Sequence, residues 1–400
     1  MSAECSLYIH IPFCAGACDY CDFFSVPVSA ADGLLDNYTG ILLGDITGQM
    51  RRFAVGRVPT VYIGGGTPSV LGAARMGRLL EGLSALLSGL DGQPEEFTVE
   101  ANPESADEDF LRACREGGVN RISLGIQSFH ELSRRAVRRI GEAALLDERL
   151  ELVSRYFPGA FSADLMAGLP FQTEAVLLSD IDRLLAYKPA HVSLYSLTLE
   201  RETVLAHRAR RYGRTALSLP DTDRAGALWL SGREALEKAG YAQYEVSSFA
   251  PPEKRCIHNI RYWRMESWLA AGPSASGTII NDETGTGCRY TWPPGIDAFF
   301  AAGRPSSGLV HVEQLDRSTL LKESLLMGFR YCGGPDAVLF RRRFGRDITG
   351  FIPQTIDRWR ERGFFNAPGA DGGLAPSPQG LLFLDAFLRD AFAELENVLV

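Results

Sequence analysis

Strand-like and helix-like segments alternate along the first half of this 400-residue chain, and this alternation constrains the fold more than any other feature. Short β-branched or aromatic runs predict strands, and segments with apolar residues at helical spacing, such as 74–87 and 107–118, separate them. About six such repeats predict a parallel sheet closed or nearly closed into a barrel. The expected strands are 7–11, 60–64, 97–101, 121–127, 161–168 and 191–197.

Polar residues gather where these strands end, which is where the βα loops of such a barrel converge and its chemistry takes place. The run "GGGTPS" (64–69) ends the second strand, and its glycines allow a ligand's polar end to approach the backbone closely. Carboxylates there suit hydroxyl or amino groups, and an arginine suits a carboxylate. The other rim residues are Glu100, Gln127, Arg139 and Asp164.

Three cysteines lie close together in "IHIPFCAGACDYCDFF" (9–24), with the spacing Cys-x3-Cys-x2-Cys and no fourth thiol. A four-iron cluster normally takes four thiolates, so Cys14, Cys18 and Cys21 alone would leave one iron open to a small ligand. The alternative is a structural zinc site that His10 completes as a Cys3His set.

Composition narrows the class of protein. The net charge of −8 and the pI near 5.4 argue against bulk nucleic-acid binding, although "HRARRYGR" (207–214) could attract an acidic ligand. Eight cysteines with one regular cluster do not resemble a secreted disulfide scaffold, so a reducing cytosol fits better. The sequence predicts neither a signal peptide nor a membrane span, and hence a cytoplasmic protein.

Three regions are expected along the chain. Residues 1–217 would form the barrel core, 218–310 an extension of it, and 311–400 a small C-terminal domain of winged-helix type. The last region shows successive helical patterns and then a short glycine-rich hairpin. Its expected helices are 319–331, 336–344 and 354–363.

A Cys-x3-Cys-x2-Cys motif directly after a first barrel strand resembles the signature of the radical S-adenosylmethionine (SAM) family. The resemblance implies an α/β partial (β/α)6 TIM-like barrel and a [4Fe-4S] cluster on Cys14, Cys18 and Cys21. It also implies that SAM chelates the open iron, and that an electron from the cluster can split the sulfonium to a radical. The residues expected around SAM are Tyr8, Tyr20, Gly65, Gly66, Thr67, Glu100, Gln127, Arg139 and Asp164.

Further motifs in order, among them "YIHIPFC", "EANP", "LGIQSF" and "ADLMAGLP", resemble the oxygen-independent coproporphyrinogen III oxidase group of that family. The group has an oxidase branch and a heme chaperone branch, HemW. The oxidase branch has a further cysteine where Phe23 stands here, and a longer segment before the cluster than the 13 residues that precede Cys14. "HNIRYW" (258–263) is similar to a HemW motif whose histidine is implicated in heme binding, which implies His258 as a heme ligand.

Three segments depart from the family pattern. "LAAGPSASG" (269–277) lacks two glycines and a histidine, Gly141 replaces the histidine of Leu-x-Arg-x-His, and Phe171 replaces a glycine. The backbone near SAM and heme is therefore expected to be shaped differently in this chain.

The resemblance implies a heme chaperone, with the oxygen-independent coproporphyrinogen III oxidase as the alternative and with dehydrogenase activity not favoured. Its cofactors would be the [4Fe-4S] cluster and SAM, with heme as cargo. The implied partners are acceptor hemoproteins, including respiratory, membrane-associated ones, and an electron donor such as flavodoxin or ferredoxin. A second copy of the chain, in a homodimer, is compatible with the resemblance.

Overall fold

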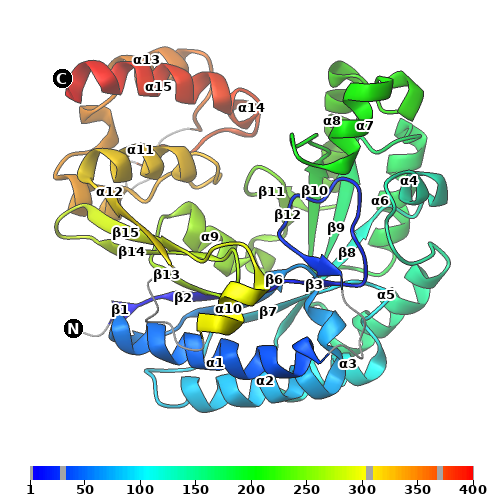
Figure 1. Cartoon of the computed structure of the whole chain (residues 1–400). Coiled ribbons are helices and arrows are strands. Elements are labelled where there is room, and N and C mark those ends of the chain that lie inside the picture. The colour runs from blue at the N-terminus through cyan, green and yellow to red at the C-terminus, as the bar shows by residue number, and fades with distance from the viewer. Residues whose placement is uncertain (1–2, 28–32, 303–309, 367–372, 400) are drawn as a thin grey trace.

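The computed structural model describes residues 3–27, 33–302, 310–366 and 373–399. Its framework is a twelve-stranded sheet in which six neighbouring parallel strands follow one another in chain order (Figure 1). The six expected strands are confirmed, with every boundary within one residue. They are β2 (Ser6–Ile11), β6 (Thr60–Gly65), β7 (Glu96–Ala101), β8 (Arg121–Gln127), β9 (Phe161–Ala167) and β10 (His191–Ser196).

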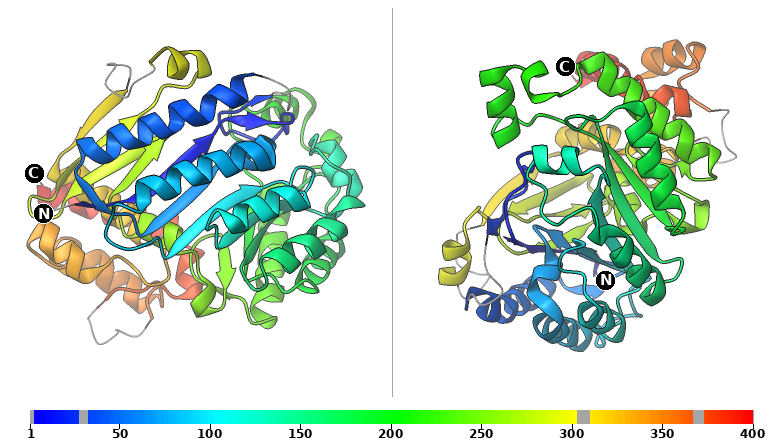
Figure 2. Two further views of the ribbon diagram at one scale, coloured as in Figure 1. Left: turned by 90° about the horizontal axis from the view of Figure 1, so that it is seen from below. Right: turned by 90° about the vertical axis from the view of Figure 1, so that its right-hand side faces the viewer.

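Helices connect these strands and cover the outer face of the curved sheet (Figures 1 and 2). The first and last of the six strands do not pair with each other, so the barrel is open, and the expected partial (β/α)6 architecture is confirmed. The helices between the strands are α1 (Leu34–Arg52), α2 (Gly72–Leu87), α3 (Glu108–Glu116), α4 (Glu131–Ala136), α5 (Leu145–Tyr156) and α6 (Glu174–Leu185), and β10 is followed by α7 (Val204–Tyr212) and α8 (Thr222–Lys238).

The six parallel strands are apolar on both faces because helices pack on one side and the barrel interior lies on the other. In β8, every residue except the last is buried. Leu7, Val61, Val99 and Leu165 belong to one continuous core that extends to helices α1, α2 and α3. This packing holds the strand ends, and the polar residues on them, in fixed positions.

Further strands extend both edges of the barrel sheet. On one side β12 (Ser248–Ala250) pairs antiparallel with β10 and with β11 (Ala242–Gln243). On the other, β13 (Trp268–Ala271) pairs parallel with β2 and leads to three antiparallel strands. These are β14 (Ser276–Asn281), β15 (Thr286–Thr291) and β16 (His311–Leu315); α9 (Ile257–Trp263) precedes β13 and α10 (Ile296–Ala302) follows β15.

Short elements complete the barrel region. The strands β3 (Phe13–Cys14) and β4 (Val26–Pro27) pair around the cysteine loop, and β1 (Ala3–Glu4) pairs with β5 (Val55–Arg57). The single 3-10 turns are η1 (Pro68–Leu71), η2 (Thr215–Leu217) and η3 (Pro252–Lys254).

The C-terminal region is helical, as expected, and has its own apolar core around Phe329, Phe364 and Phe387. The expected glycine-rich hairpin falls partly on 367–372, outside the described residues, and a bridge joins Phe365 to Pro376 beside it. The domain boundaries at 217 and 310 stay predictions. The elements are α11 (Arg317–Gly328), α12 (Ala337–Phe344), η4 (Ile348–Gly350), α13 (Pro353–Glu361), α14 (Pro378–Leu381) and α15 (Leu384–Leu399).

No helix within the described ranges is both long and apolar enough to cross a membrane.

Candidate functional site

A cavity of about 480 Å³ lies at the carboxyl ends of the parallel strands, between them and the cysteine loop. The structure brings together around it the three cysteines and every residue expected to bind SAM except Tyr8. Sequence reasoning missed several other lining residues, of which Asn102 has a signal, because it belongs to the same "EANP" segment as Glu100. The missed residues include Asn102, Glu104, Ser123, Met166, Tyr195, Thr198 and Glu200.

The three cysteine thiols are free, half-buried and face the cavity. Cys14 Sγ lies 3.3 Å from Thr67 Oγ1, and Arg139 Nη1 donates to Cys18 Sγ at 3.8 Å. Burial raises the pKa of Cys14 and of Cys21, because it disfavours a thiolate. The thiolate form therefore needs nearby positive charge, which Arg139 supplies in part and bound iron would complete.

The geometry fits an iron–sulfur cluster better than the zinc alternative. His10 is buried, and both its ring nitrogens are occupied, Nδ1 by Tyr8 Oη at 3.1 Å and Nε2 by the Phe24 carbonyl at 3.0 Å. Among the described residues, no three His, Cys, Asp or Glu side chains gather tightly enough to hold a single metal ion. In a four-iron cluster each thiolate binds its own iron, so its ligands stand further apart than those of one zinc ion.

The "GGGTPS" glycines are required by packing between the strand end and the cysteine loop. A Cβ atom on Gly65, whose φ is +112°, would lie 2.5 Å from the His10 ring, and one on Gly66 would lie 2.7 Å from the Phe13 carbonyl. A Cβ on Gly64 would come within 2.9 Å of the Glu100 carboxylate. These contacts give the glycines a role in seating the cysteine loop, in addition to the expected approach of a ligand.

Two half-buried carboxylates, Glu100 and Asp164, lie in the cavity wall. Glu100 accepts hydrogen bonds from Tyr62 Oη at 2.7 Å and from the Gly65 amide at 3.1 Å. Burial raises its pKa to about 7, and the charge of Asp164 contributes. Burial likewise raises the pKa of Asp164 to about 6. Both groups therefore change charge near neutral pH, and a cationic ligand would favour their ionised forms.

Gln127 and Arg139 present polar groups that the protein leaves partly unused. Gln127 has a φ of +68°, unusual for a residue with a side chain, and its buried Oε1 has no partner in the described part of the chain. Arg139 Nη2 donates to Asn102 Oδ1 at 2.7 Å and to the Gly125 carbonyl at 2.6 Å, while its buried Nε has no partner there. An acceptor and a donor thus remain for a ligand.

Tyr8 and His258 lie apart from this cavity, since neither is among its lining residues. Tyr8 bonds to His10, as described above, and stacks on Tyr62 at 6.4 Å between ring centroids. His258 is 1% exposed and lies by the first residue of β6, at the opposite end of the strands.

Hydrogen bonds determine the tautomer of His258. Its Nδ1 lies 2.8 Å from Thr60 Oγ1, and the Thr60 hydroxyl donates its proton to Ser6 Oγ at 2.9 Å. Thr60 can therefore only accept from Nδ1–H, which leaves Nε2 with a free lone pair. That Nε2 is buried without a partner among the described residues. Burial lowers the pKa of His258 to about 3, with a contribution from Arg261, so the ring is neutral.

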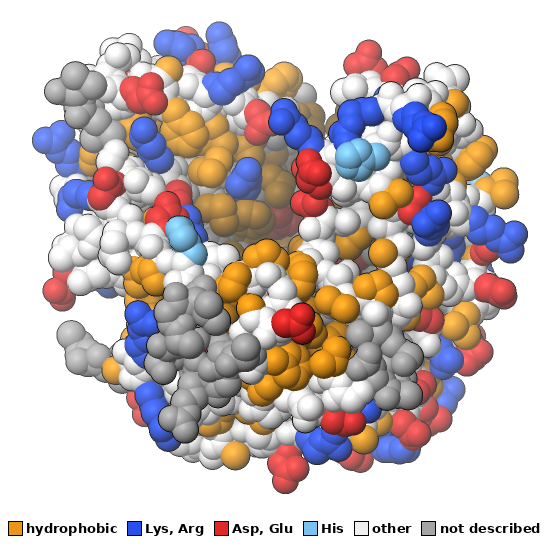
Figure 3. Space-filling model, viewed as in Figure 1, with side chains coloured by type: hydrophobic (Ala, Val, Ile, Leu, Met, Phe, Trp, Pro, Cys, Tyr) orange, Lys and Arg blue, Asp and Glu red, His pale blue; other side chains and the backbone are white. Residues whose placement is uncertain are grey.

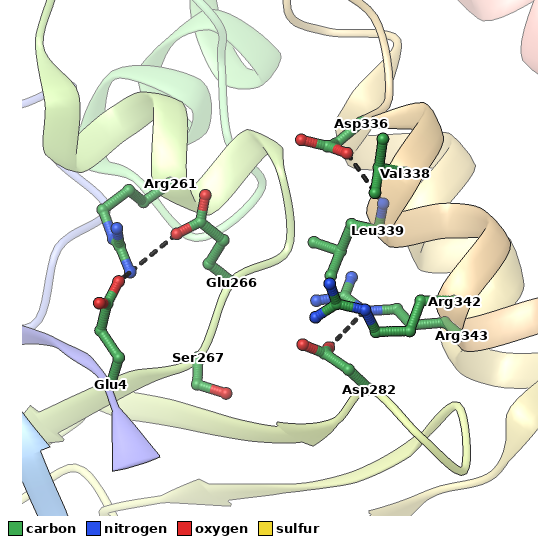
Figure 4. Close-up of a pocket in the computed structure, with 10 residues that line it drawn as sticks. All are labelled: Glu4, Arg261, Glu266, Ser267, Asp282, Asp336, Val338, Leu339, Arg342 and Arg343. Carbon is green, nitrogen blue, oxygen red and sulfur yellow. Dashed lines mark hydrogen bonds and ion pairs between the residues drawn. The ribbon is translucent and has the colours of Figure 1, made fainter. Parts of the chain in front are cut away.

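A second cavity, of about 330 Å³, lies between α12 on one side and β1 and α9 on the other (Figure 4). Most of its charges pair with one another: Arg261 binds Glu266 at 2.7 Å, and Arg343 binds Asp282 at 2.8 Å. These pairs account for most of its charged lining without a ligand.

Comparisons with known proteins show the family and the fold of the chain. Residues 8–184 match the profile of the Radical SAM superfamily. The chain is 33% identical to the heme chaperone HemW of Lactococcus lactis, over 88% of this chain and 90% of that protein, and 38% identical to HemW of Escherichia coli K12, over 68% and 70%. The solved structure of E. coli coproporphyrinogen III oxidase (HemN), a radical SAM enzyme, superposes with a TM-score of 0.78 at 21% identity, over 98% of this chain and 90% of that one.

Proposed function

Because the chain belongs to the HemW family of heme chaperones within the radical SAM superfamily, we propose that it binds heme and delivers it to acceptor hemoproteins. One observation carries this function: similarity to heme chaperones extends over nearly the whole of both chains. The oxidase alternative has less support, because the likeness to HemN, at 21% identity, concerns the fold alone. In addition, Phe23, which replaces the extra cysteine of the oxidases, lines the cavity and is 69% exposed.

The cavity would hold the cofactors of the superfamily, a [4Fe-4S] cluster and SAM. Cys14, Cys18 and Cys21 would hold the cluster, which when bound offers an open iron and a transferable electron to SAM. Glu100 and Asp164 would attract the positive charge of SAM, and Arg139 and Gln127 would orient its polar groups. The acceptor hemoproteins, the flavodoxin or ferredoxin donor, the homodimer and the cytoplasmic location stay predictions.

Heme would bind apart from this cavity, at His258. The free Nε2 lone pair of a neutral imidazole is what a heme iron requires of an axial ligand. A broad hollow lies between the C-terminal helices and the barrel strands, with many apolar side chains on its walls (Figure 3), and α9 lies in this part of the molecule (Figure 1). None of the cavities described above is lined by His258, so heme binding there requires neighbouring side chains to move.

Heme titration of the anaerobically purified protein, with and without SAM, tests the function. We expect saturable binding with a defined heme spectrum, followed by transfer of heme to an added apo-hemoprotein. Incubation with coproporphyrinogen III, SAM and a reductant is the control, and we expect no protoporphyrinogen from it. Formation of that product would make the oxidase the better assignment, and failure to bind heme would reject the chaperone function.

Affinity for SAM is expected to fall by about tenfold between pH 8 and pH 5.5. In the free protein the raised pKa of Glu100 means that the folded state takes up a proton as the pH falls through about 7, and Asp164 follows near 6. Protonation removes the negative charge that attracts SAM. As the pH rises, ionisation of the same carboxylates lowers the stability of the ligand-free protein. Because SAM binds their ionised forms more tightly, it should raise the melting temperature more at pH 8 than at pH 5.5.

Equilibrium dialysis and thermal unfolding across this pH range provide the measurement. In a Glu100→Gln, Asp164→Asn double variant the pH dependence should disappear. An Asp45→Asn variant is the matched control, because burial raises the pKa of Asp45 to about 7 as well but Asp45 does not line the cavity. If Asp45→Asn flattens the pH profile of SAM binding as much as the double variant does, that profile does not report on the cavity.

A further inference from the structure

One buried arginine outside the cavity binds the two segments that carry Gln127 and Arg139. Arg134, on α4, is 1% exposed and is absent from the cavity lining. Its Nη1 donates to the carbonyls of Ile126 at 2.7 Å and Ser128 at 3.1 Å. Its Nη2 donates to the carbonyls of Ile140 and Gly141, both at 3.0 Å. A rigid, planar guanidinium thus fixes four acceptors at once.

The positions of these carbonyls relate Arg134 to the cavity. Ile126 and Ser128 are the two neighbours of Gln127, whose φ of +68° needs support from its surroundings. Ile140 and Gly141 directly follow Arg139, whose own amide donates to the Arg134 carbonyl at 2.9 Å. Arg134 therefore ties the turn that presents Gln127 to the turn that presents Arg139.

The charge of Arg134 makes this arrangement costly. Among the described residues Arg134 forms no ion pair, and its four hydrogen bonds all go to neutral carbonyls. Burial lowers its pKa, and the like charge of Arg139 lowers it further, while the charges of Glu104 and Glu131 offset part of this effect. An apolar side chain would fill the interior at lower cost but could not hold four carbonyls. This comparison indicates that Arg134 positions the backbone it binds and does more than fill space in the interior.

The backbone at residue 141 favours glycine because of its conformation. Gly141 has a φ of +79°, which residues with a side chain rarely adopt. A Cβ atom there would lie 3.4 Å from Glu104 Oε2 and 3.7 Å from Arg134 Nη2, both ordinary van der Waals distances. The turn that supplies two of the four carbonyls to Arg134 therefore depends on glycine for its shape.

We propose that Arg134 is a positioning residue that fixes the separation of Gln127 and Arg139 and thereby sets the affinity of the cavity for SAM. The inference rests on the proposed function, since it requires SAM in this cavity. Arg134 contacts none of the three cluster cysteines in the described structure, so the cluster itself is expected to assemble without it.

The test uses the full chain with its cluster reconstituted anaerobically, and the variants Arg134→Met and Arg134→Lys. By analogy with other supporting residues around metal sites, we expect the SAM dissociation constant to rise about 10- to 100-fold in Arg134→Met. Arg134→Lys keeps the charge but not the planar fork, so it should also weaken SAM binding. Iron content and the electron paramagnetic resonance (EPR) spectrum of the reduced cluster without SAM should be unchanged, whereas the SAM-induced change in that spectrum should need more SAM.

Arg343→Met is the matched control for loss of a buried arginine. Arg343 is 3% exposed and donates to the Met265 carbonyl at 2.7 Å and to Asp282 (Figure 4), far along the chain from the cavity residues. It should lower stability but leave SAM affinity at the wild-type value. If Arg134→Met does not fold, Arg134→Lys carries the test.

The outcomes separate the two levels of the proposal. Wild-type SAM affinity in the folded Arg134 variants would overturn the positioning role and leave the proposed function intact. A wild-type protein that binds neither cluster nor SAM would overturn the proposed cofactor site itself. Equal loss of SAM affinity in Arg343→Met would show that any destabilisation has this effect, and would also reject the positioning role.

Discussion

Replacement of Cys14, Cys18 or Cys21 with serine is expected to abolish the iron–sulfur cluster of the anaerobically reconstituted protein. Each thiol faces the same cavity, and each would be the only protein ligand of its iron, so the other two cannot substitute for it. Serine has no thiolate to offer and binds iron poorly. Iron and sulfide content, together with the visible absorption of the brown protein, should fall to background in each variant.

The other five cysteines provide the controls. Cys5, Cys114 and Cys256 are buried in the core, and burial raises the pKa of each thiol, to about 12 for Cys5. Cys256 in addition donates to Glu96 at 3.2 Å. Alanine at any of the five positions should leave iron content unchanged, and loss of the cluster from one of them would overturn the ligand assignment. The remaining two are Cys288 and Cys332.

The barrel could be predicted from the sequence because the patterns that indicate its strands and helices are local. Each strand is a short β-branched or aromatic run, and Glu100 and Gln127 lie at the ends of such runs, whereas Asp164 lies within β9 and Arg139 follows α4. Parallel strands place their carboxyl ends at one edge, so residues far apart in sequence could be assigned to one rim. The loop that carries the cysteines was recognised by its spacing.

Contacts between distant segments could not be predicted in the same way. The sequence gives no sign that His10 and the Phe13 backbone occupy the space above Gly65 and Gly66, or that Tyr8 stands apart from the cavity. Arg134 belongs to no recognised sequence motif. Its partners are backbone carbonyls, which every residue has, so the sequence does not reveal its role. The glycine at 141, where the family pattern has a histidine, is explained only by the φ of +79° that the backbone adopts there.

Charge separates the predicted SAM and heme sites. The cavity is lined by several carboxylates, among them Asp22, Glu104 and Glu200, and by Arg139 as its one basic side chain in the described lining. This balance attracts the cationic sulfonium of SAM and repels the propionates of heme. Tyr62 joins the two sites, because its ring stacks on His258 at 5.1 Å and its Oη donates to Glu100 at 2.7 Å. Variants at the cavity and at His258 should therefore act independently only where they leave Tyr62 in place.

The His258→Ala variant is expected to weaken heme binding by about 10- to 100-fold, since loss of an axial ligand removes a coordinate bond worth a few kcal/mol in affinity. The heme absorption spectrum should change with it, while cluster content and SAM affinity stay at wild-type values.

His191→Ala is the matched control: His191 is 2% exposed, binds Tyr244 through Nε2 at 2.9 Å and leaves its Nδ1 without a partner among the described residues. It should bind heme as the wild type does. Thr60→Val should give an intermediate result. It removes the acceptor that holds the ring proton on Nδ1, so Nε2 is no longer fixed in the unprotonated form that binds iron. A wild-type spectrum and affinity in His258→Ala would instead leave His258 as a packing residue against Tyr62, on which its ring stacks at 5.1 Å, and would move the search for the heme ligand elsewhere on the chain.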